Sequence, residues 1–229
     1  MLWENIRSNE FKDAVELSKG VCAVPIGCLE KHGPHSPLGT DIIAPRQMAI
    51  NAAKKEPVVI FPTMYFGEKS GAGEFPGTII FSVETRWHIF RETVNEIYRN
   101  GFRKILFVNG HGGNNDMLGT FVRGMLQENP KVMLFITGTN NGLKFEKIAE
   151  DPSYDYLTDE DRAILQEFSQ EKRDGHAGFG ETAHILHLMP ETLRLDGAVP
   201  VPPACGSAGE LQCEAAALLR PAPLRPAWL

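Results

Sequence analysis

The sequence lacks the features that mark membrane-spanning, secreted or disulfide-built proteins. No apolar run approaches the roughly 20 residues of a membrane helix, and the longest, such as residues 58–61, have the length of a strand. The first residues lack the basic-then-apolar layout of a secretory signal. The four cysteines show no Cys-x-x-Cys spacing, so they indicate neither a zinc knuckle nor a disulfide framework. We therefore expect reduced thiols and a cytoplasmic location.

An excess of positive charge is also missing. The chain has 23 basic and 29 acidic residues among 229, with a net charge of −6, which argues against nucleic acid or anionic membranes as partners. This length suits one α/β domain with a full-sized core. We expect the domain to cover residues 1–203. The tail, residues 204–229, is rich in Pro, Ala and Leu and is expected to be loosely ordered.

Short apolar runs alternate with stretches of helical periodicity along the chain. Strands are expected at residues 21–26, 58–61, 78–81, 104–108 and 132–137, and helices at about 42–54, 84–100 and 114–127. One face of the second helix is apolar, formed by Trp87, Phe90, Val94, Ile97 and Tyr98. Strands that alternate with helices predict a mostly parallel sheet in a layered α/β/α fold. The polar segment 138–174 is expected to form a lid or an excursion from this fold.

The first cluster of polar residues with chemical potential lies at residues 27–41, directly after the first expected strand. Glu30 and His32 are two residues apart, so in an extended segment both side chains point to the same side. Glycines and prolines then let the chain turn back and bring Asp41 beside them. Carboxylates and an imidazole are typical ligands of zinc, manganese or iron(II). The alternative is an exposed loop whose polar side chains face water.

A second cluster, residues 109–115, follows the strand expected at 104–108. Parallel strands end at the same edge of a sheet, so His111 can face the same crevice as the first cluster. Gly112 and Gly113 allow the backbone to approach an ion or a substrate closely. A phosphate-binding loop is not indicated, because the glycine pattern of such loops is missing. The alternative is a turn that caps a helix, with His111 packed in the core.

A third cluster lies at residues 175–184, where a glycine-rich loop enters a helix. His176 is a candidate proton donor to a leaving group, and Glu181 is a candidate metal ligand or base. The alternatives are a simple loop histidine and a glutamate favoured by the dipole of a first helical turn. His35 lies close enough to the first cluster to contact a substrate. His184 and His187 are interpreted as ordinary helix-surface or interface residues.

Together these clusters resemble the creatininase family, the creatinine amidohydrolases, over roughly residues 20 to 195. The matching segments are Glu30-Lys-His-Gly-Pro-His35 with Asp41, Phe75-Pro-Gly-Thr78, Asn109-Gly-His-Gly-Gly-Asn114, and His176-Ala-Gly with Glu181-Thr182. The resemblance implies a layered α/β domain that assembles into homohexamers.

The resemblance further implies two divalent metal ions per chain, of zinc, manganese or iron(II). Glu30 and His111 match the ligands of one ion, and His32 matches a ligand of the other. Asp41 matches the carboxylate that bridges both ions. Two such ions can activate water and polarise an amide carbonyl.

The function implied is that of a metal-dependent amidohydrolase that cleaves a C–N bond of a small amide, cyclic amide or formamide. His176 and Glu181 match the catalytic histidine and glutamate of the family. Creatinine-cleaving members carry a glutamate ligand at the position of Gly113, so here Glu181 or water is expected to complete the second metal site. They also carry a tryptophan shortly before the catalytic histidine, whereas residues 171–175 contain no aromatic side chain. Creatinine is therefore expected to be a poor substrate.

Two other functions remain to be weighed. One is a peptidase that acts in the maturation of a peptide-derived cofactor, since members of the family have that role. The other is a non-catalytic binding protein on the same fold, which would not need converging metal ligands. The partners expected are a small amide substrate and further copies of the chain, without nucleic acid or membrane.

Overall fold

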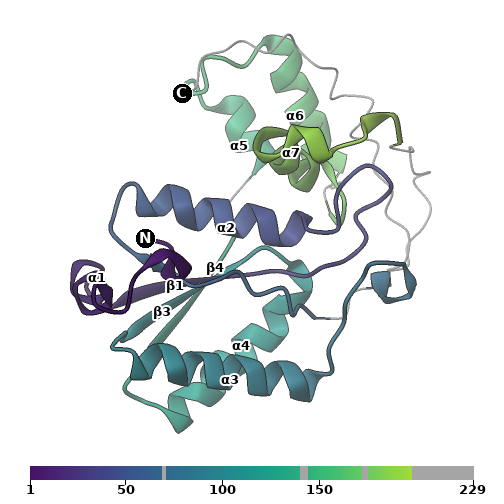
Figure 1. Cartoon of the computed structure of the whole chain (residues 1–229). Coiled ribbons are helices and arrows are strands. Elements are labelled where there is room, and N and C mark those ends of the chain that lie inside the picture. Colours follow the sequence, from purple (N-terminus) through teal and green to yellow (C-terminus); the bar gives the residue numbers. More distant parts are fainter. Residues whose placement is uncertain (69–70, 140–143, 172–174, 198–229) are drawn as a thin grey trace. The chain divides into compact units, whose positions relative to one another are not determined.

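A computed structural model describes residues 1–68, 71–139, 144–171 and 175–197 of the chain (Figure 1). The chain divides into two compact units. The sheet unit consists of Met1–Lys31 and Leu38–Asn141, and the helical unit consists of His32–Pro37 and Gly142–Leu229. The tail expected at residues 204–229 lies outside the described residues, so the domain boundary at residue 203 stays a prediction.

The sheet unit is built on four parallel strands. They are β1 (Val21–Ile26), β2 (Val59–Ile60), β3 (Lys104–Asn109) and β4 (Met133–Gly138), in the order β2-β1-β3-β4. The two central strands, β1 and β3, pair in parallel over six residues, from Val21 opposite Lys104 to Ile26 opposite Asn109. The predicted parallel sheet is confirmed, with each crossover made by a helix as this topology requires.

Helices cover both faces of this sheet, which confirms the layered α/β fold (Figure 1). Helix α2 (Thr40–Ala53) lies on one face, whereas α3 (Val83–Arg99) and α4 (Asn115–Glu128) lie on the other. Successive strand residues face opposite layers, and the buried residues divide accordingly. The layer of α3 and α4 contains Cys22, Val24, Ile26, Phe90, Val94, Ile97, Ile105, Phe107, Leu118, Phe121 and Met125. The layer of α2 contains Ala23, Ala49, Val58, Ile60 and Val108.

Pro25 lies within a central strand, where proline is normally excluded because it cannot donate a ladder hydrogen bond. Its carbonyl oxygen accepts from the backbone N–H of Met64 at 2.9 Å, so the polar groups of Pro25 face the β2 side. Strand β2 has already ended at Ile60. The missing N–H therefore costs no ladder bond, and the strand continues to Ile26.

The expected strand at residues 78–81 is wrong. Among the described residues, Ile79 forms only an isolated antiparallel bridge with Leu29, through a 2.9 Å hydrogen bond from its N–H to the Leu29 carbonyl. The segment is β-prone in composition, but Ile79 stays exposed and finds no strand edge to extend. It braces the chain that leaves β1 and does not widen the sheet.

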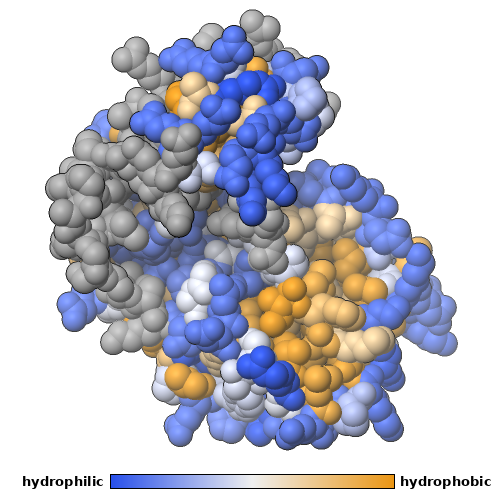
Figure 2. All heavy atoms as spheres, turned by 180° about the vertical axis from the view of Figure 1, so that it is seen from behind, coloured by the Kyte–Doolittle hydropathy of each residue, from blue (hydrophilic) through white to orange (hydrophobic). Residues whose placement is uncertain are grey.

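Shorter elements complete the sheet unit: η1 (Trp3–Asn5), α1 (Phe11–Leu17), η2 (Gly71–Glu74) and η3 (Gly112–Asn114). On edge strand β4, Met133, Phe135 and Ile136 are exposed. Apolar side chains also gather in one area of the molecular surface seen from behind (Figure 2). None of the described helices is long and apolar enough to cross a membrane.

The helical unit contains α5 (Phe145–Glu150), α6 (Asp159–Glu171), α7 (Phe179–Leu188), η4 (Pro190–Thr192) and η5 (Leu195–Gly197). Arg162 of α6 donates to the carbonyl oxygens of Ala149 and Tyr154 and so ties α6 to the end of α5. The rings of Phe145 and Phe179 pack edge to face with centroids 5.6 Å apart, which joins α5 to α7. The polar segment 138–174, expected to form a lid or an excursion, therefore contains the helices α5 and α6, which were not predicted from the sequence.

Candidate metal centre and catalytic residues

The central strands of the sheet unit end beside one another, and each is followed by a candidate ligand. Glu30 lies four residues beyond the end of β1, and His111 lies two residues beyond the end of β3. Asp41 is in the first turn of α2, the helix that follows Glu30 in the chain. Open α/β sheets bind ligands at this carboxyl edge, between strands whose crossovers leave on opposite faces.

A hub of asparagine side chains holds the His111 loop. The Oδ1 of Asn109 accepts from the N–H of His111 at 3.2 Å, and its Nδ2 donates to the His111 carbonyl at 2.8 Å. Asn109 also bonds Asn114 and Asn115, each at 3.0 Å. These bonds satisfy the polar groups of a buried turn and fix the direction of the imidazole. Asn109 is thus a positioning residue to which the sequence interpretation gave no role.

Two glycines bring the backbone of Asp41 against the ends of both central strands. A Cβ atom at Gly27 or at Gly110 would collide with the carbonyl oxygen of Asp41. At Gly110 it would also lie 2.6 Å from the ring of Pro45. Both positions therefore require glycine, because any side chain there would prevent the close approach of α2. The start of α2 is seated directly on the strand ends.

The result is a buried triad of Glu30, His111 and Asp41. Nδ1 of His111 lies 3.1 Å from Oε1 of Glu30 and 2.8 Å from Oδ2 of Asp41. Glu30 is 0% exposed, Asp41 1% and His111 5%. Burial by itself would lower the pKa of His111, but hydrogen bonds to Asp41 and Glu30 and their negative charges outweigh it and raise that pKa to about 10.

The chemistry of this triad fits a divalent cation. Two buried carboxylates concentrate negative charge at the imidazole, and a bound cation would neutralise it. Ligand atoms that bind one ion at about 2.1 Å lie about 3.0–3.4 Å apart in octahedral or tetrahedral geometry, close to the distances measured here. Nε2 of His111 has no hydrogen-bond partner among the described residues, and a Cβ at Gly113 would lie 2.5 Å from it.

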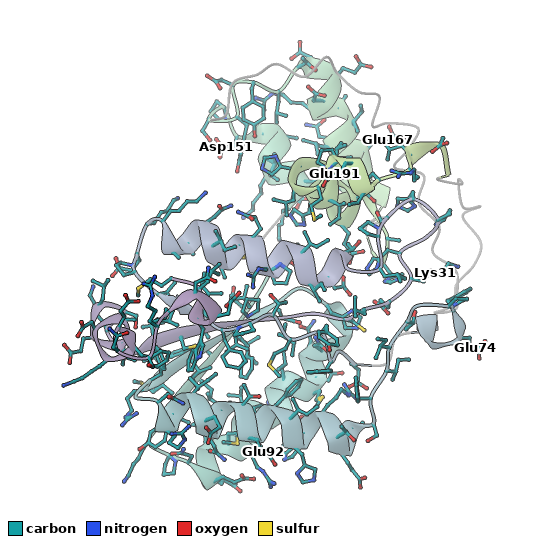
Figure 3. All side chains as sticks on the ribbon, viewed as in Figure 1. Lys31, Glu74, Glu92, Asp151, Glu167 and Glu191 are labelled. Carbon is teal, nitrogen blue, oxygen red and sulfur yellow. The ribbon has the colours of Figure 1, made fainter. Side chains whose placement is uncertain are left out.

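The segment that carries Glu30 is clamped by the Phe75–Thr78 stretch, within the sheet unit. The N–H of Lys31 donates to Oγ1 of Thr78 at 3.1 Å, and Nζ of Lys31 lies 3.5 Å from the centroid of the Phe75 ring. The Glu30 N–H donates to the Leu38 carbonyl at 3.2 Å. Lys31 is labelled on this segment in Figure 3. These contacts give Phe75 and Thr78 a supporting role that their matching motif did not reveal.

The helical unit has its own cluster of candidate residues. Nε2 of His32 lies 3.5 Å from Oε2 of Glu181, and the rings of His32 and His176 are 4.4 Å apart between centroids. Oε2 of Glu181 also accepts from the N–H of Ala177 at 2.6 Å. Glu181 therefore stabilises the start of α7, as the alternative interpretation proposed, and also contacts His32.

The turn before α7 is held in an uncommon conformation. Ala177 has a φ of 55°, in the left-handed region that residues with a Cβ rarely adopt, and it is 0% exposed. Its N–H is bound by Glu181, and the next residue, Gly178, donates to the carbonyl of Gly175 at 2.9 Å. Such strain persists where surrounding contacts fix it, often at functional sites. Here it places His176 next to His32.

His35 is buried in the same unit, and its surroundings lower its pKa. Its Nε2 lies 3.1 Å from Oγ1 of Thr182, and its carbonyl accepts from the N–H of Arg194 at 2.9 Å. Desolvation lowers the pKa of His35, the nearby His32 lowers it further, and a backbone hydrogen bond with Ala177 opposes them. The positive φ of Gly33, 65°, turns the chain so that His35 folds back over it.

We expect His35 to make the protein less stable in mild acid. Its folded pKa lies below the unfolded value of about 6.5, so the unfolded chain binds the proton more tightly. The free energy of unfolding therefore falls as the pH drops below about 6.5. Urea unfolding of chelator-treated protein near pH 7.5 and pH 5 should show a larger loss for the wild type than for His35→Gln, which does not titrate. Equal losses would contradict this account.

The structure thus brings the candidate residues together in two groups, one in each unit. Glu30, Asp41 and His111 meet in the sheet unit, where Gly112 and Gly113 are exposed beside them. His32, His176 and Glu181 meet in the helical unit, near His35. Two histidines left without a functional role are exposed: His88 beside Arg91, and His187 on α7. Residues 172–174, part of the stretch without an aromatic side chain, lie outside the described residues.

Buried carboxylates and histidines at the carboxyl edge of an open parallel sheet are typical of metal-dependent hydrolases of the α/β class. A family model of creatininase, described as creatinine amidohydrolase, matches residues 4–222. The chain therefore belongs to the creatininase family. Its members are amidohydrolases, and the protein is accordingly a hydrolase that acts on C–N bonds.

Individual relatives agree with this assignment. Creatinine amidohydrolase of Pseudomonas putida is 26% identical over 204 residues, covering 85% of this chain and 74% of that protein. Mycofactocin precursor peptide peptidase of Mycolicibacterium smegmatis is 27% identical over 194 residues, covering 82% of this chain and 64% of that protein. A crystal structure of creatinine amidohydrolase has a TM-score of 0.72 at 22% identity, covering 95% of this chain and 91% of that chain. The likeness to solved structures establishes the fold.

Proposed function

We propose that the protein hydrolyses a C–N bond of a small amide, cyclic amide or formamide with the help of two divalent metal ions. The observation that carries the proposal is the buried triad in the sheet unit, where His111 lies between Glu30 and Asp41. A binding protein without turnover has no physical need to bury two carboxylates and an imidazole at this cost in desolvation.

The residues divide into three roles. Glu30, His111 and Asp41 would hold one ion, and Asp41 would share the second ion with His32. Glu181 contacts His32 and offers the carboxylate that Gly113 cannot supply.

Bound divalent ions would supply Lewis acidity at the amide carbonyl and lower the pKa of a coordinated water. Side chains of the protein would carry out proton transfer and substrate binding. His176, stacked near His32, is placed to donate a proton to the departing nitrogen. Gly112 and Gly113 are exposed beside His111 and are proposed to contact the substrate, and His35 is proposed as a further substrate contact from its place in the family motif.

Metal content is the direct test. The full chain, reconstituted with zinc, manganese or iron(II) and freed of excess ion, should contain close to two ions per chain by elemental analysis. Solved relatives described as zinc–zinc and manganese forms of creatininase make zinc and manganese the first ions to try. Less than about half an ion per chain after reconstitution would refute the proposal.

His176→Ala is expected to lower turnover by about 100-fold or more, the usual scale for a general acid, and to leave metal content unchanged. The substrate would come from a screen of amides, formamides and short peptides with metal-loaded protein. His187→Ala, which removes an exposed histidine of the same unit, is the matched control. Loss of metal from His176→Ala would instead make His176 a ligand.

Creatinine is expected to be a poor substrate, with kcat/KM below about 10⁴ M⁻¹s⁻¹, the low end of proficient enzymes. A side chain at Gly113 would start 2.5 Å from Nε2 of His111, so this chain has neither the carboxylate nor the space for it. The steady-state interconversion of creatinine and creatine by metal-loaded protein is the measurement. A higher value would make creatinine hydrolysis the function.

A second candidate is peptide-bond cleavage in the maturation of a peptide-derived cofactor. It is favoured by the likeness to mycofactocin precursor peptide peptidase, of which this chain covers 64%, against 74% of creatinine amidohydrolase. Turnover of short peptides but not of small amides in the screen would select this function. We also propose, from family resemblance, that the chain assembles into homohexamers in the cytoplasm.

A further inference from the structure

A cysteine lies next to the buried triad of the sheet unit. Cys28, which is 1% exposed, directly follows Gly27 after strand β1. Ligand atoms of Cys28, Glu30 and His111 all lie within 4.8 Å of one another, and all three residues are buried. Cys28 and Glu30 are two residues apart in an extended segment, so their side chains point to the same side.

The packing around Cys28 holds its sulfur in this place. A Cβ atom at Gly67 would lie 2.5 Å from Cβ and 2.9 Å from Sγ of Cys28, so the absence of a side chain at Gly67 makes room for the thiol. Gly67 is followed by Glu68, which binds the side chains of Asn114 and of the fully buried Arg86. Sγ lies 4.0 Å from the carbonyl oxygen of Glu68, a long distance for a hydrogen bond, and also interacts with the backbone of Gly67.

We propose that Cys28 is a fourth protein ligand, beside Asp41, of the metal ion held by Glu30 and His111, and that its sulfur makes this ion zinc in preference to manganese. The inference rests on the proposed metal site. Coordination would replace the S–H bond by a sulfur–metal bond and release the proton to solvent, because a bound cation deprotonates a coordinating thiol.

The geometry and the chemistry of the ligands agree with this role. Zinc binds sulfur at about 2.3 Å and nitrogen or oxygen at about 2.0–2.1 Å, which sets neighbouring ligand atoms about 3.4–3.6 Å apart in a tetrahedron. The ligand atoms, which lie within 4.8 Å of one another, would have to approach by at most about 1.2–1.4 Å to reach these distances. Thiolate ligands favour zinc, cobalt and iron, whereas manganese prefers oxygen, so a sulfur ligand discriminates between the candidate ions.

Cobalt(II) is the probe, because a thiolate ligand gives it a strong charge-transfer absorption in the near ultraviolet. One equivalent added to the metal-free full chain should produce this band in the wild type and in Cys22→Ala. Cys22 is the matched control, since it is a buried, free cysteine in the core layer of α3 and α4. Cys28→Ser should bind cobalt without the band, and its zinc affinity should fall about 10–100-fold with manganese affinity changed less than about 3-fold.

The outcomes separate the two proposals. Cobalt bound by the wild type without the band would overturn the role of Cys28 and leave the metal site standing. A band retained by Cys28→Ser would assign the sulfur to another cysteine and overturn it as well. No binding of cobalt or zinc would refute the metal site itself. If Cys28→Ser does not fold, X-ray absorption of the zinc-loaded wild type decides, since a zinc–sulfur distance near 2.3 Å is required.

Discussion

Replacing Asp41 by asparagine is expected to weaken zinc binding by more than about 100-fold. Removing a residue that only hydrogen-bonds to a metal ligand already lowers metal affinity by about 10–100-fold. Removing a direct anionic ligand should lower it more. Asp41 is buried with its Oδ2 2.8 Å from Nδ1 of His111, so water cannot easily take its place. If Asp41 bridges both ions, as proposed, the stoichiometry should also fall below one ion per chain.

Competition between the metal-free protein and a chromophoric chelator would measure this affinity, with circular dichroism as a check of folding. Asp116→Asn is the matched control, because Asp116 also lies in the first turn of a helix of the sheet unit but is exposed. The control should bind zinc as the wild type does. An Asp41→Asn protein that binds zinc within about 3-fold of the wild type would remove Asp41 from the site.

Gly110→Ala is expected to destabilise the protein by about 3 kcal/mol or more and to weaken metal binding at the same time. The new Cβ would collide with the backbone carbonyl of Asp41 and lie 2.6 and 2.7 Å from two ring carbons of Pro45. A flexible side chain could swing away, but a helix backbone and a proline ring cannot. Overpacking usually costs about 1–3 kcal/mol, and a clash between rigid groups belongs at or above the upper end. Moving α2 away would also displace Asp41 from His111.

Urea unfolding and the zinc competition assay test both parts of this prediction. Gly119→Ala in α4 is the control, because a Cβ at Gly119 meets nothing within 4 Å. There alanine should leave stability unchanged or raise it by about 0.5–1 kcal/mol, as is usual inside a helix. If Gly110→Ala were as stable as Gly119→Ala, α2 would not be seated on the end of β3 as described.

The strands and helices of the sheet unit could be predicted from the sequence because each depends on the pattern of apolar residues within one short segment. The short apolar runs of β1 and β3 and the helical period of α3 and α4 can each be recognised within a single segment of the sequence. The predicted apolar face of α3 was nearly right, yet Arg86 is fully buried there, whereas Trp87 is only half-buried. Arg86 is held by Glu68, a partner 18 residues away that periodicity does not reveal.

In the candidate site, too, contacts between residues far apart in the sequence could not be predicted. Glu30, Asp41 and His111 could be identified from the sequence, because their residue types suit a metal and they follow expected strands. The roles of Asn109, Gly27 and Gly110 were not, because they consist of contacts between strand ends and a helix start. Cys28 was passed over since it belongs to no cysteine pair, and only its distance from Glu30 and His111 makes it a candidate.

The strand order has a consequence for how the protein acquires metal. β1 pairs with β3 along its whole length, although roughly eighty residues of chain separate the two strands. Glu30 and His111 become neighbours only when this pairing is made, and such long-range parallel pairing forms late and slowly because loop closure comes first. If the proposed ion binds these two residues, we expect it to be taken up by a chain that has already folded. It would then slow unfolding and leave the rate of folding nearly unchanged.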